Sequence, residues 1–201
     1  LSDRGDVRAI VISSTGRHFS AGMDLSVFTS SGLSMDGEPG RRNAGMSLLV
    51  KRLQASFTAL EEARVPVLAA VQGGCIGGAV DMVCAADMRY ASADAFFVVQ
   101  ETSIGMTADV GTLQRLPKLI PDGVARELVY TGRRMPAERA REVGLVNEVF
   151  ADHDSLVSGV LEIAAEIAAH SPLAIWGAKE SLVYARDHGV DDSLRQMGWV
   201  Q

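Results

Sequence analysis

The sequence predicts an α/β fold in which short strands alternate with helices. Two observations predict it. Short runs rich in β-branched and other apolar residues recur along the chain, and segments with helical spacing or helix-start residues stand between them. The runs predicted to be strands are 7–13, 64–74, 88–92, 95–100 and 144–150. Because strands and helices alternate, the strands are expected to pair in parallel.

The first predicted helix covers residues 44–63, where apolar residues recur at steps of three and four. That spacing places them on one helical face. The members of this face are Met46, Leu49, Leu53, Phe57 and Leu60. Residues 26–43, which precede the helix, contain Gly, Ser and Pro with little periodicity. We expect a mobile loop there, and it is the segment with the strongest expectation of disorder.

The later helices follow the later strands. One is expected at about 77–86, after the glycine-rich end of the second strand. Residues 110–144 read as several short helices, because three prolines divide the segment. Two longer helices are predicted at 154–169 and 172–187, the second with a proline at its first position.

Composition narrows the class of protein. The chain has 201 residues, of which 47% are apolar and 22% charged, as in an ordinary globular domain. A net charge of −6 without long basic runs argues against a nucleic-acid partner, and no apolar run has membrane-spanning length. Cys75 and Cys84 lack CxxC spacing, so they are expected to be reduced core residues rather than a metal or redox site.

Two predicted strand ends carry glycine-containing loops, 20–24 ("SAGMD") and 73–78 ("GGCIGG"). In α/β folds ligands bind at the carboxyl ends of strands, and glycine lets them approach backbone N–H groups. The phosphate-loop pattern is absent, and the dinucleotide pattern GxGxxG fails because Cys75 stands at its middle glycine. The two loops fit another use better, in which one backbone N–H group from each loop donates to the same ligand oxygen. Such an oxyanion hole contributes roughly 3–4 kcal/mol for each donor.

Three carboxyl groups stand in apolar surroundings near these loops: Asp81, Glu101 and Asp109. Unpaired buried charge is costly, so the combination indicates a shared pocket. Burial and mutual repulsion are expected to raise some of their pKa values and to couple them. Taken singly, each acid has an ordinary alternative. Asp109 could be a helix N-cap, Glu101 an exposed loop acid, and Asp81 a partner of Arg89 or a residue near the surface.

The segments "FSAGMDL", "PVLAAVQGGCIGGAVDMVCAADMRYAS" and "GTLQRLPKLI" resemble the enoyl-CoA hydratase/isomerase, or crotonase, superfamily over about residues 7–150. The resemblance implies a crotonase-like (ClpP/crotonase) spiral of ββα repeats with a helical C-terminal region. It also implies an acyl-CoA substrate whose thioester oxygen accepts hydrogen bonds from the backbone N–H groups of Met23 and Gly78. The substrate-binding residues implied on the same two loops are Ala21, Gly22, Asp24 and Gly77.

Within the superfamily the chain is most similar to the Δ3,5-Δ2,4-dienoyl-CoA isomerases, through "GGCIGGAVD", "DAFFVVQE" and "TADVGTLQRLPK". Hydratases of the family typically have glutamate at the positions of Asp81 and Glu101, and they tend to have glycine at that of Asp109. The resemblance therefore implies an isomerase of fatty-acid β-oxidation with Glu101, Asp109 and Asp81 as catalytic residues. Glu101 is expected nearer C2 and Asp109 nearer C6, although the reverse assignment stays open, and Asp81 is expected to support both.

No metal or redox cofactor is expected, since coenzyme A is part of the substrate, and the family usually assembles as homotrimers or hexamers. Two other functions stay open at this point. One is hydration of a 2-enoyl-CoA on the same scaffold, and the other is a non-catalytic acyl-CoA-binding scaffold. Three costly buried carboxyls weigh against a pure binder. The four histidines are scattered, and neither HExxH nor GxSxG is present.

We expect two regions, a core with the acyl-CoA site at 1–150 and a C-terminal helical region at 151–201. Both ends look cut, because a strand comes almost at once and the last residues read as a helix in mid-course. The high Ala, Gly and Arg content favours a bacterial cytoplasmic protein, with a mitochondrial or peroxisomal protein as the eukaryotic alternative. Membrane insertion is not expected.

Overall fold

The structure is a computed structural model that describes residues 2, 4–24 and 38–197. Its described strands form two sheets. The first is parallel throughout, in the order β1-β2-β4-β7: β1 (Ile10–Ile12), β2 (Val67–Val71), β4 (Met88–Ser92) and β7 (Glu148–Phe150). The second has the order β3-β5-β6: β3 (Gly74–Ile76), β5 (Phe96–Val98) and β6 (Met135–Pro136). The α/β prediction is confirmed, and antiparallel pairing of β5 with β6 is the exception to the expected parallel arrangement.

The run predicted as one strand at 64–74 is two strands in different sheets. β2 ends at Val71, and β3 begins at Gly74. Between them Gly73 has a φ of 53°, a left-handed conformation that glycine adopts without steric cost. The turn carries the chain from the first sheet to the second. Both strands are largely buried, so their apolar residues merge into one run in the sequence.

Helices separate most of the strands, as predicted. The described helices are α2 (Pro39–Glu61), α3 (Gly78–Cys84), the 3-10 helix η2 (Glu101–Ile104), α4 (Thr112–Leu119), α5 (Asp122–Thr131), α6 (Ala137–Glu142), α7 (His153–Ala168), α8 (Pro172–Asp187) and α9 (Val190–Met197). The segment 110–144 holds the expected short helices and also β6, which was not predicted.

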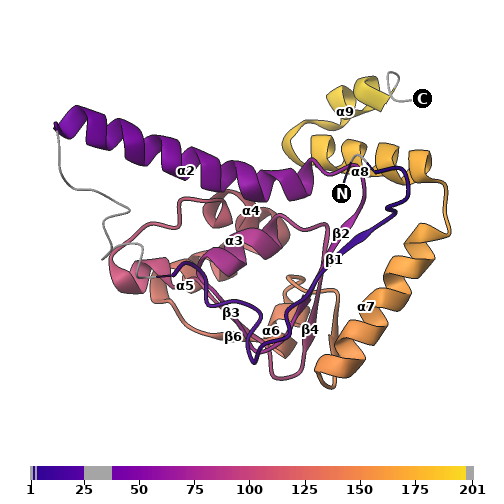
Figure 1. Cartoon of the computed structure of the whole chain (residues 1–201), viewed down its shortest axis with the longest axis horizontal. Coiled ribbons are helices and arrows are strands. Elements are labelled where there is room, and N and C mark those ends of the chain that lie inside the picture. The colour runs from indigo at the N-terminus through magenta and orange to yellow at the C-terminus, as the bar shows by residue number, and fades with distance from the viewer. Residues whose placement is uncertain (1, 3, 25–37, 198–201) are drawn as a thin grey trace.

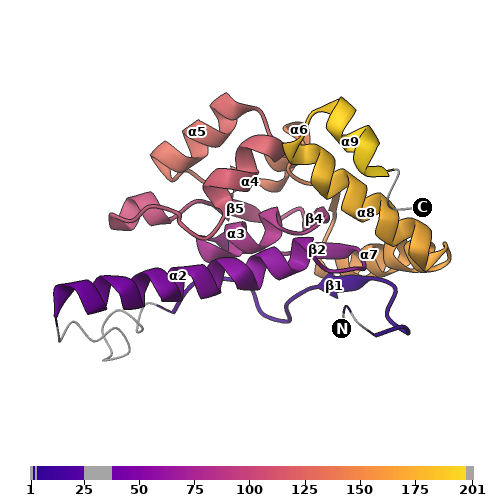
Figure 2. The same ribbon diagram turned by 90° about the horizontal axis from the view of Figure 1, so that it is seen from above.

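The helix α2 begins earlier than predicted. Glu38 caps it through its carboxylate, which accepts hydrogen bonds from the N–H groups of Gly40 and Arg41 at 2.8 and 3.0 Å. The prediction of a loop at 26–43 is therefore wrong for residues 39–43, which are helical. Its remainder lies outside the described residues, apart from the cap. In both views the N-terminal end of α2 reaches beyond the other described elements (Figures 1 and 2), and none of its residues is buried.

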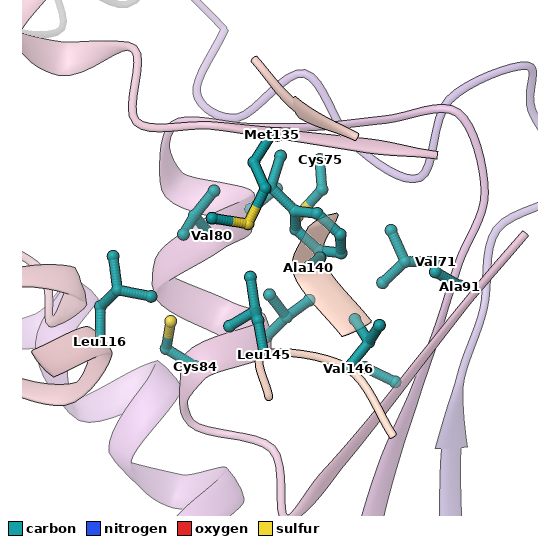
Figure 3. Packing of buried hydrophobic residues seen from close by; sticks show 14 of the residues in the cluster. Val71, Cys75, Val80, Cys84, Ala91, Leu116, Met135, Ala140, Leu145 and Val146 are labelled. Atoms are coloured by element: carbon teal, nitrogen blue, oxygen red, sulfur yellow. The ribbon is translucent and has the colours of Figure 1, made fainter. Parts of the chain in front are cut away.

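The main hydrophobic core lies between the sheets and α3, α4 and α6. Figure 3 shows Val80 and Cys84 of α3 close to Leu116, Met135 and Leu145. Full burial of a leucine or valine side chain contributes about 1.5–3 kcal/mol, so this cluster fixes α3 firmly against the sheets. Cys75 and Cys84 are free thiols buried in this core, as predicted.

A smaller core joins α7 to the first sheet. Leu156 and Val160 of α7 are fully buried against Leu68, Ala70 and Tyr90. Three helices follow β7, which gives the expected helical C-terminal region. No single described helix is long and apolar enough to cross a membrane. Taken together, α7 and α8 have the length and apolar composition of a membrane span, but a bend of 107° separates the two helices.

Candidate active site

The structure brings the two glycine loops together. Ser20 forms a parallel bridge with Cys75, its N–H donating to the Gly74 carbonyl and its carbonyl accepting from the Ile76 N–H, both at 3.1 Å. Gly22 then turns toward α3 with a φ of 85°. A Cβ at this position would lie 2.7 Å from the Ile76 carbonyl oxygen and 3.2 Å from the Gly78 nitrogen. Only glycine fits so close an approach.

The N–H groups of Met23 and Gly78 are the two donors predicted for the oxyanion hole. Gly78 is the first residue of α3, and a Cβ on it would meet no atom within 4 Å, so its surroundings are open. Met23 is exposed on the adjoining loop. Within the described part of the chain, neither N–H donates to another protein group. Both donors are therefore available to a ligand, and the loops that carry them are in contact.

The remaining loop residues with a predicted substrate role lie at the same place. Ala21 and Asp24 are exposed beside Gly22 and Met23. Gly77 has a φ of 57°, and its N–H donates to the Val98 carbonyl at 2.9 Å. A Cβ on Gly77 would lie 3.2 Å from Oε1 of Glu101. The Glu101 carboxyl group therefore lies directly against the glycine pair.

Asp81 is fully buried one turn into α3. Its Oδ1 accepts a hydrogen bond of 2.5 Å from the N–H of Thr112, the first residue of α4. The N-cap position of α4 is Gly111, which has no side chain to cap the helix, so Asp81 satisfies this N–H from another helix. This overturns two alternatives. Asp109 is not the N-cap, and Asp81 is neither near the surface nor paired with Arg89.

Arg89 has other partners. It is buried, and its guanidinium donates to the carbonyl oxygens of Leu145 and Ala86, each at 2.7 Å. Asp81 therefore has no cation in direct hydrogen-bond contact among the described residues. Its Oδ2 and the Oε2 of Glu101 are both buried, and neither has a hydrogen-bond partner in the described part of the chain. Buried carboxyl oxygens without partners are expected where a ligand or a bound proton completes the site.

Electrostatics couples the three acids. Burial raises the pKa of Glu101, and the negative charges of Asp81 and Asp109 raise it further. Burial also raises the pKa of Asp81, the Asp109 charge adds to this, and the hydrogen bond from the Thr112 N–H opposes it. A carboxyl group with a raised pKa is a better general base and a more readily available acid near neutral pH. These directions agree with the sequence-based expectation for a shared pocket.

Asp109 differs from the other two acids in its surroundings. It is exposed, on the loop between η2 and α4, and follows the buried Ala108. Its carbonyl oxygen accepts a hydrogen bond of 2.6 Å from Nε2 of Gln54 on α2. The loop is therefore held to α2 through the Asp109 backbone, and the Asp109 side chain takes no part in this contact. The charge of that side chain contributes to the raised pKa values of Asp81 and Glu101.

Sequence reasoning missed Gln54, Thr112 and the pair Arg115–Glu61. Nη2 of Arg115 on α4 donates to Oε2 of Glu61 on α2 at 2.7 Å, and both side chains are about nine-tenths buried. The signal was present as polar residues at 54, 58 and 61, spaced for one face of the predicted helix. No cluster of three or more metal-ligating side chains is found among the described residues.

A protein-family model described as enoyl-CoA hydratase/isomerase matches residues 1–196. The chain is 45% identical to the mitochondrial Delta(3,5)-Delta(2,4)-dienoyl-CoA isomerase of Rattus norvegicus over 199 residues, which are 98% of this chain and 61% of that protein. It is 41% identical to the peroxisomal protein of the same name from Arabidopsis thaliana over 196 residues, 96% of this chain and 70% of that protein.

The fold has solved counterparts. The crystal structure of an enoyl-CoA hydratase from Bacillus anthracis superposes with a TM-score of 0.86 and 30% sequence identity, covering 99% of this chain and 72% of that chain. The residues of this chain thus span 61% of the length of the rat relative and most of the bacterial structure.

Proposed function

The chain belongs to the enoyl-CoA hydratase/isomerase family, and we propose that it isomerises 3,5-dienoyl-CoA to 2,4-dienoyl-CoA in fatty-acid β-oxidation. The observation that carries the proposal is that the Glu101 carboxyl group lies against the Gly77–Gly78 pair, with the charges of Asp81 and Asp109 near enough to raise its pKa. Glu101 lies against Gly77, Asp81 is buried beneath α4, and Asp109 stands on an exposed loop. The relatives named dienoyl-CoA isomerase support the same reaction.

The proposed reaction needs two proton transfers at distant carbons. One proton leaves C2, the electron pairs shift so that the 3,5-double bonds become 2,4-double bonds, and one proton is added at C6. A single carboxyl group is badly placed to reach both carbons, whereas two can serve one each. Glu101, beside the glycine pair that would hold the thioester, is proposed to take the C2 proton. Asp109 is proposed to deliver the proton to C6.

The negative charge that develops on the thioester oxygen is proposed to fall on the N–H groups of Met23 and Gly78. Such donors act most strongly on the charge that forms in the transition state, and each is worth roughly 3–4 kcal/mol. Ala21, Gly22, Asp24 and Gly77 are proposed to shape the substrate site around them. No other cofactor is proposed, because coenzyme A arrives with the substrate.

Asp81 is proposed to support the other two acids in two ways. Its hydrogen bond to the Thr112 N–H fixes the start of α4, which directly follows the Asp109 loop. Its charge raises the pKa of Glu101. The first effect holds one acid in place, and the second keeps the other a stronger base.

The proposal is tested by following the ultraviolet absorbance of the 2,4-dienoyl product with the purified protein and 3,5-dienoyl-CoA. Replacing Asp109 with asparagine keeps its size and removes the proton donor, so we expect turnover to fall about 100- to 10,000-fold, the usual contribution of a general acid or base. The matched control is Asp191→Asn, an exposed aspartate on α9, which is expected to keep wild-type turnover. Unchanged turnover in Asp109→Asn would overturn the proposal.

The same preparation separates the two alternatives. Faster water-dependent formation of a 3-hydroxyacyl-CoA from a 2-enoyl-CoA would identify a hydratase, which is how the Bacillus anthracis structure is named. Tight acyl-CoA binding without turnover of any enoyl or dienoyl substrate would identify a binding scaffold.

Assembly and location are part of the proposal. We propose a homotrimer or hexamer, to be checked by the molar mass in solution. We propose a cytoplasmic location if the source is bacterial, and a mitochondrial or peroxisomal one if it is eukaryotic. The rat and Arabidopsis relatives are named as mitochondrial and peroxisomal proteins.

A further inference from the structure

The Asp109 loop has few anchors of its own. Ala108 is buried in the core, and the next residue, Asp109, is exposed. The direction of the Asp109 side chain depends on how its own peptide groups are turned. The 2.6 Å hydrogen bond from Gln54 Nε2 fixes one of these groups through the Asp109 carbonyl oxygen.

A cavity borders the backbone that follows Asp109. A cavity of about 380 Å³ between α2, α4 and α8 is lined by Gln54, Val110, Gly111 and Arg115, among others. The backbone after Asp109 is therefore not held by close packing on this side. Gly111 itself has a φ of 139°, a conformation that side-chain-bearing residues rarely adopt. Polar contacts from α2 take the place of packing here.

These contacts come from one face of α2. Gln54, Thr58 and Glu61 recur at steps of four and three, which places them one above another on a helix. Gln54 binds the Asp109 carbonyl, while Thr58 and Glu61 accept hydrogen bonds from Nη2 of Arg115 at 3.1 and 2.7 Å. Asp109 and Arg115, on either side of Gly111, are thus joined to the same helix.

We propose that Gln54 is a positioning residue that sets the direction of the Asp109 carboxyl group toward the far end of the dienoyl chain. The inference rests on the proposed function, because it assigns Gln54 a part in the proton transfer that Asp109 is proposed to perform. Gln54 acts only through the Asp109 backbone. A displacement of about 1 Å at a reacting group can cost on the order of 100-fold in rate, so a single hydrogen bond has a measurable effect here.

The test compares Gln54→Leu, which keeps the approximate size and removes the donor, with the matched control Gln196→Leu on α9. Each variant and the wild type receive 3,5-dienoyl-CoA in D2O. Formation of the 2,4-dienoyl product is followed by absorbance, and deuterium at C2 of the recovered substrate is followed by mass spectrometry. Thermal unfolding checks that each variant is folded.

We expect Gln54→Leu to lower kcat about 10- to 100-fold with little change in KM, and to match the deuterium pattern of Asp109→Asn. Gln196→Leu should behave as the wild type. A merely structural role would lower both proton transfers equally and lower the unfolding temperature. The inference is overturned if Gln54→Leu keeps wild-type turnover, or if it loses C2 exchange while Asp109→Asn retains it. A wild-type protein without dienoyl-CoA turnover overturns the proposed function instead.

Discussion

The two halves of the candidate site are built in different ways. The glycine-loop half consists of the 20–24 and 73–78 loops with Asp81 and Glu101, and it is fixed by the core and by backbone hydrogen bonds. The Asp109 half is an exposed loop held mainly by side chains of α2. If the proposed function holds, the difference implies that the thioester end depends on backbone placement, whereas the far end of the substrate depends on an acid positioned by side chains.

The largest effect should come from closing the contact between the glycine loops. Gly22→Ala places a Cβ 2.7 Å from the Ile76 carbonyl oxygen at a φ of 85°, so the Met23 N–H must move. We expect a loss of about 100-fold or more in kcat/KM for the dienoyl substrate, as for the removal of one oxyanion donor. Steady-state kinetics measures it.

The matched control is Gly45→Ala in α2, where an added Cβ meets nothing within 4 Å. It should keep wild-type activity, since alanine also favours the helix. Equal activity of Gly22→Ala and Gly45→Ala would show that the two loops do not act together.

A smaller effect is expected on the Asp109 half. Arg115→Met removes the cation that joins α4 to Glu61, and the side chains of the pair are only 12% and 10% exposed. Glu61 also pairs with Arg186 of α8, so its carboxylate keeps one cation, and we expect the lost hydrogen bonds of Arg115 to cost about 1–2 kcal/mol in unfolding free energy by urea denaturation.

The control for this prediction is Arg126→Met. Arg126 pairs with Asp122 on the surface, where both side chains are about 60% exposed. Exposed pairs contribute about 0–1 kcal/mol, so this variant should unfold close to the wild type. Equal losses in the two variants would contradict the anchoring role given to Arg115.

Asp81 links the halves, and its ionisation should cost stability. Its pKa is raised in the folded state, mainly by burial, so its protonated form is favoured there. The stabilisation that comes from protonated Asp81 is fully present below the pKa of the unfolded chain, and it is lost as the pH rises through the pKa of the folded protein. Asp81→Asn should therefore be more stable than the wild type at pH 7, while keeping an oxygen for the Thr112 N–H.

This difference should vanish in acid, where Asp81 is protonated in both states. Urea denaturation at pH 7 and near pH 3 measures both ends of the range. A variant less stable than the wild type at pH 7 would mean that the charged carboxylate stabilises the fold through its hydrogen bond.

The smallest predicted effect is a change in the pH profile. The Asp81 charge contributes to the raised pKa of Glu101. If Glu101 is the base, activity rises with pH as it ionises, and Asp81→Asn should move this acid limb to lower pH. The normalised profile of kcat/KM against pH measures the shift. A limb that stays in place would separate the titration of Glu101 from Asp81.

The sequence predicted the glycine-loop half better than the Asp109 half. Strand ends, glycine spacing and the acid at 81 follow from local pattern and from backbone rules that act over a few residues. The hydrogen bonds of Gln54 with Asp109 and of Asp81 with Thr112 join residues 55 and 31 positions apart, which no local pattern specifies. For the same reason the N-cap interpretation of Asp109 failed, because the capping carboxylate comes from another helix.

The division of the fold was limited in a similar way. The sequence pattern predicts one strand over 64–74, because buried strands of two different sheets share the same apolar composition. Apolar periodicity predicted the helix α2, but it did not predict that Met46 on its apolar face would be 42% exposed in the described chain. Burial is a tertiary property, and the periodicity of one helix does not contain it.

The central claim is that Glu101 and Asp109 serve opposite ends of the diene. It is tested most directly by deuterium exchange at C2 of 3,5-dienoyl-CoA in D2O, measured for Glu101→Gln and Asp109→Asn alongside product formation. We predict that both variants lose isomerisation, that Asp109→Asn still exchanges the C2 proton, and that Glu101→Gln does not. Wild-type isomerisation by either variant would contradict it.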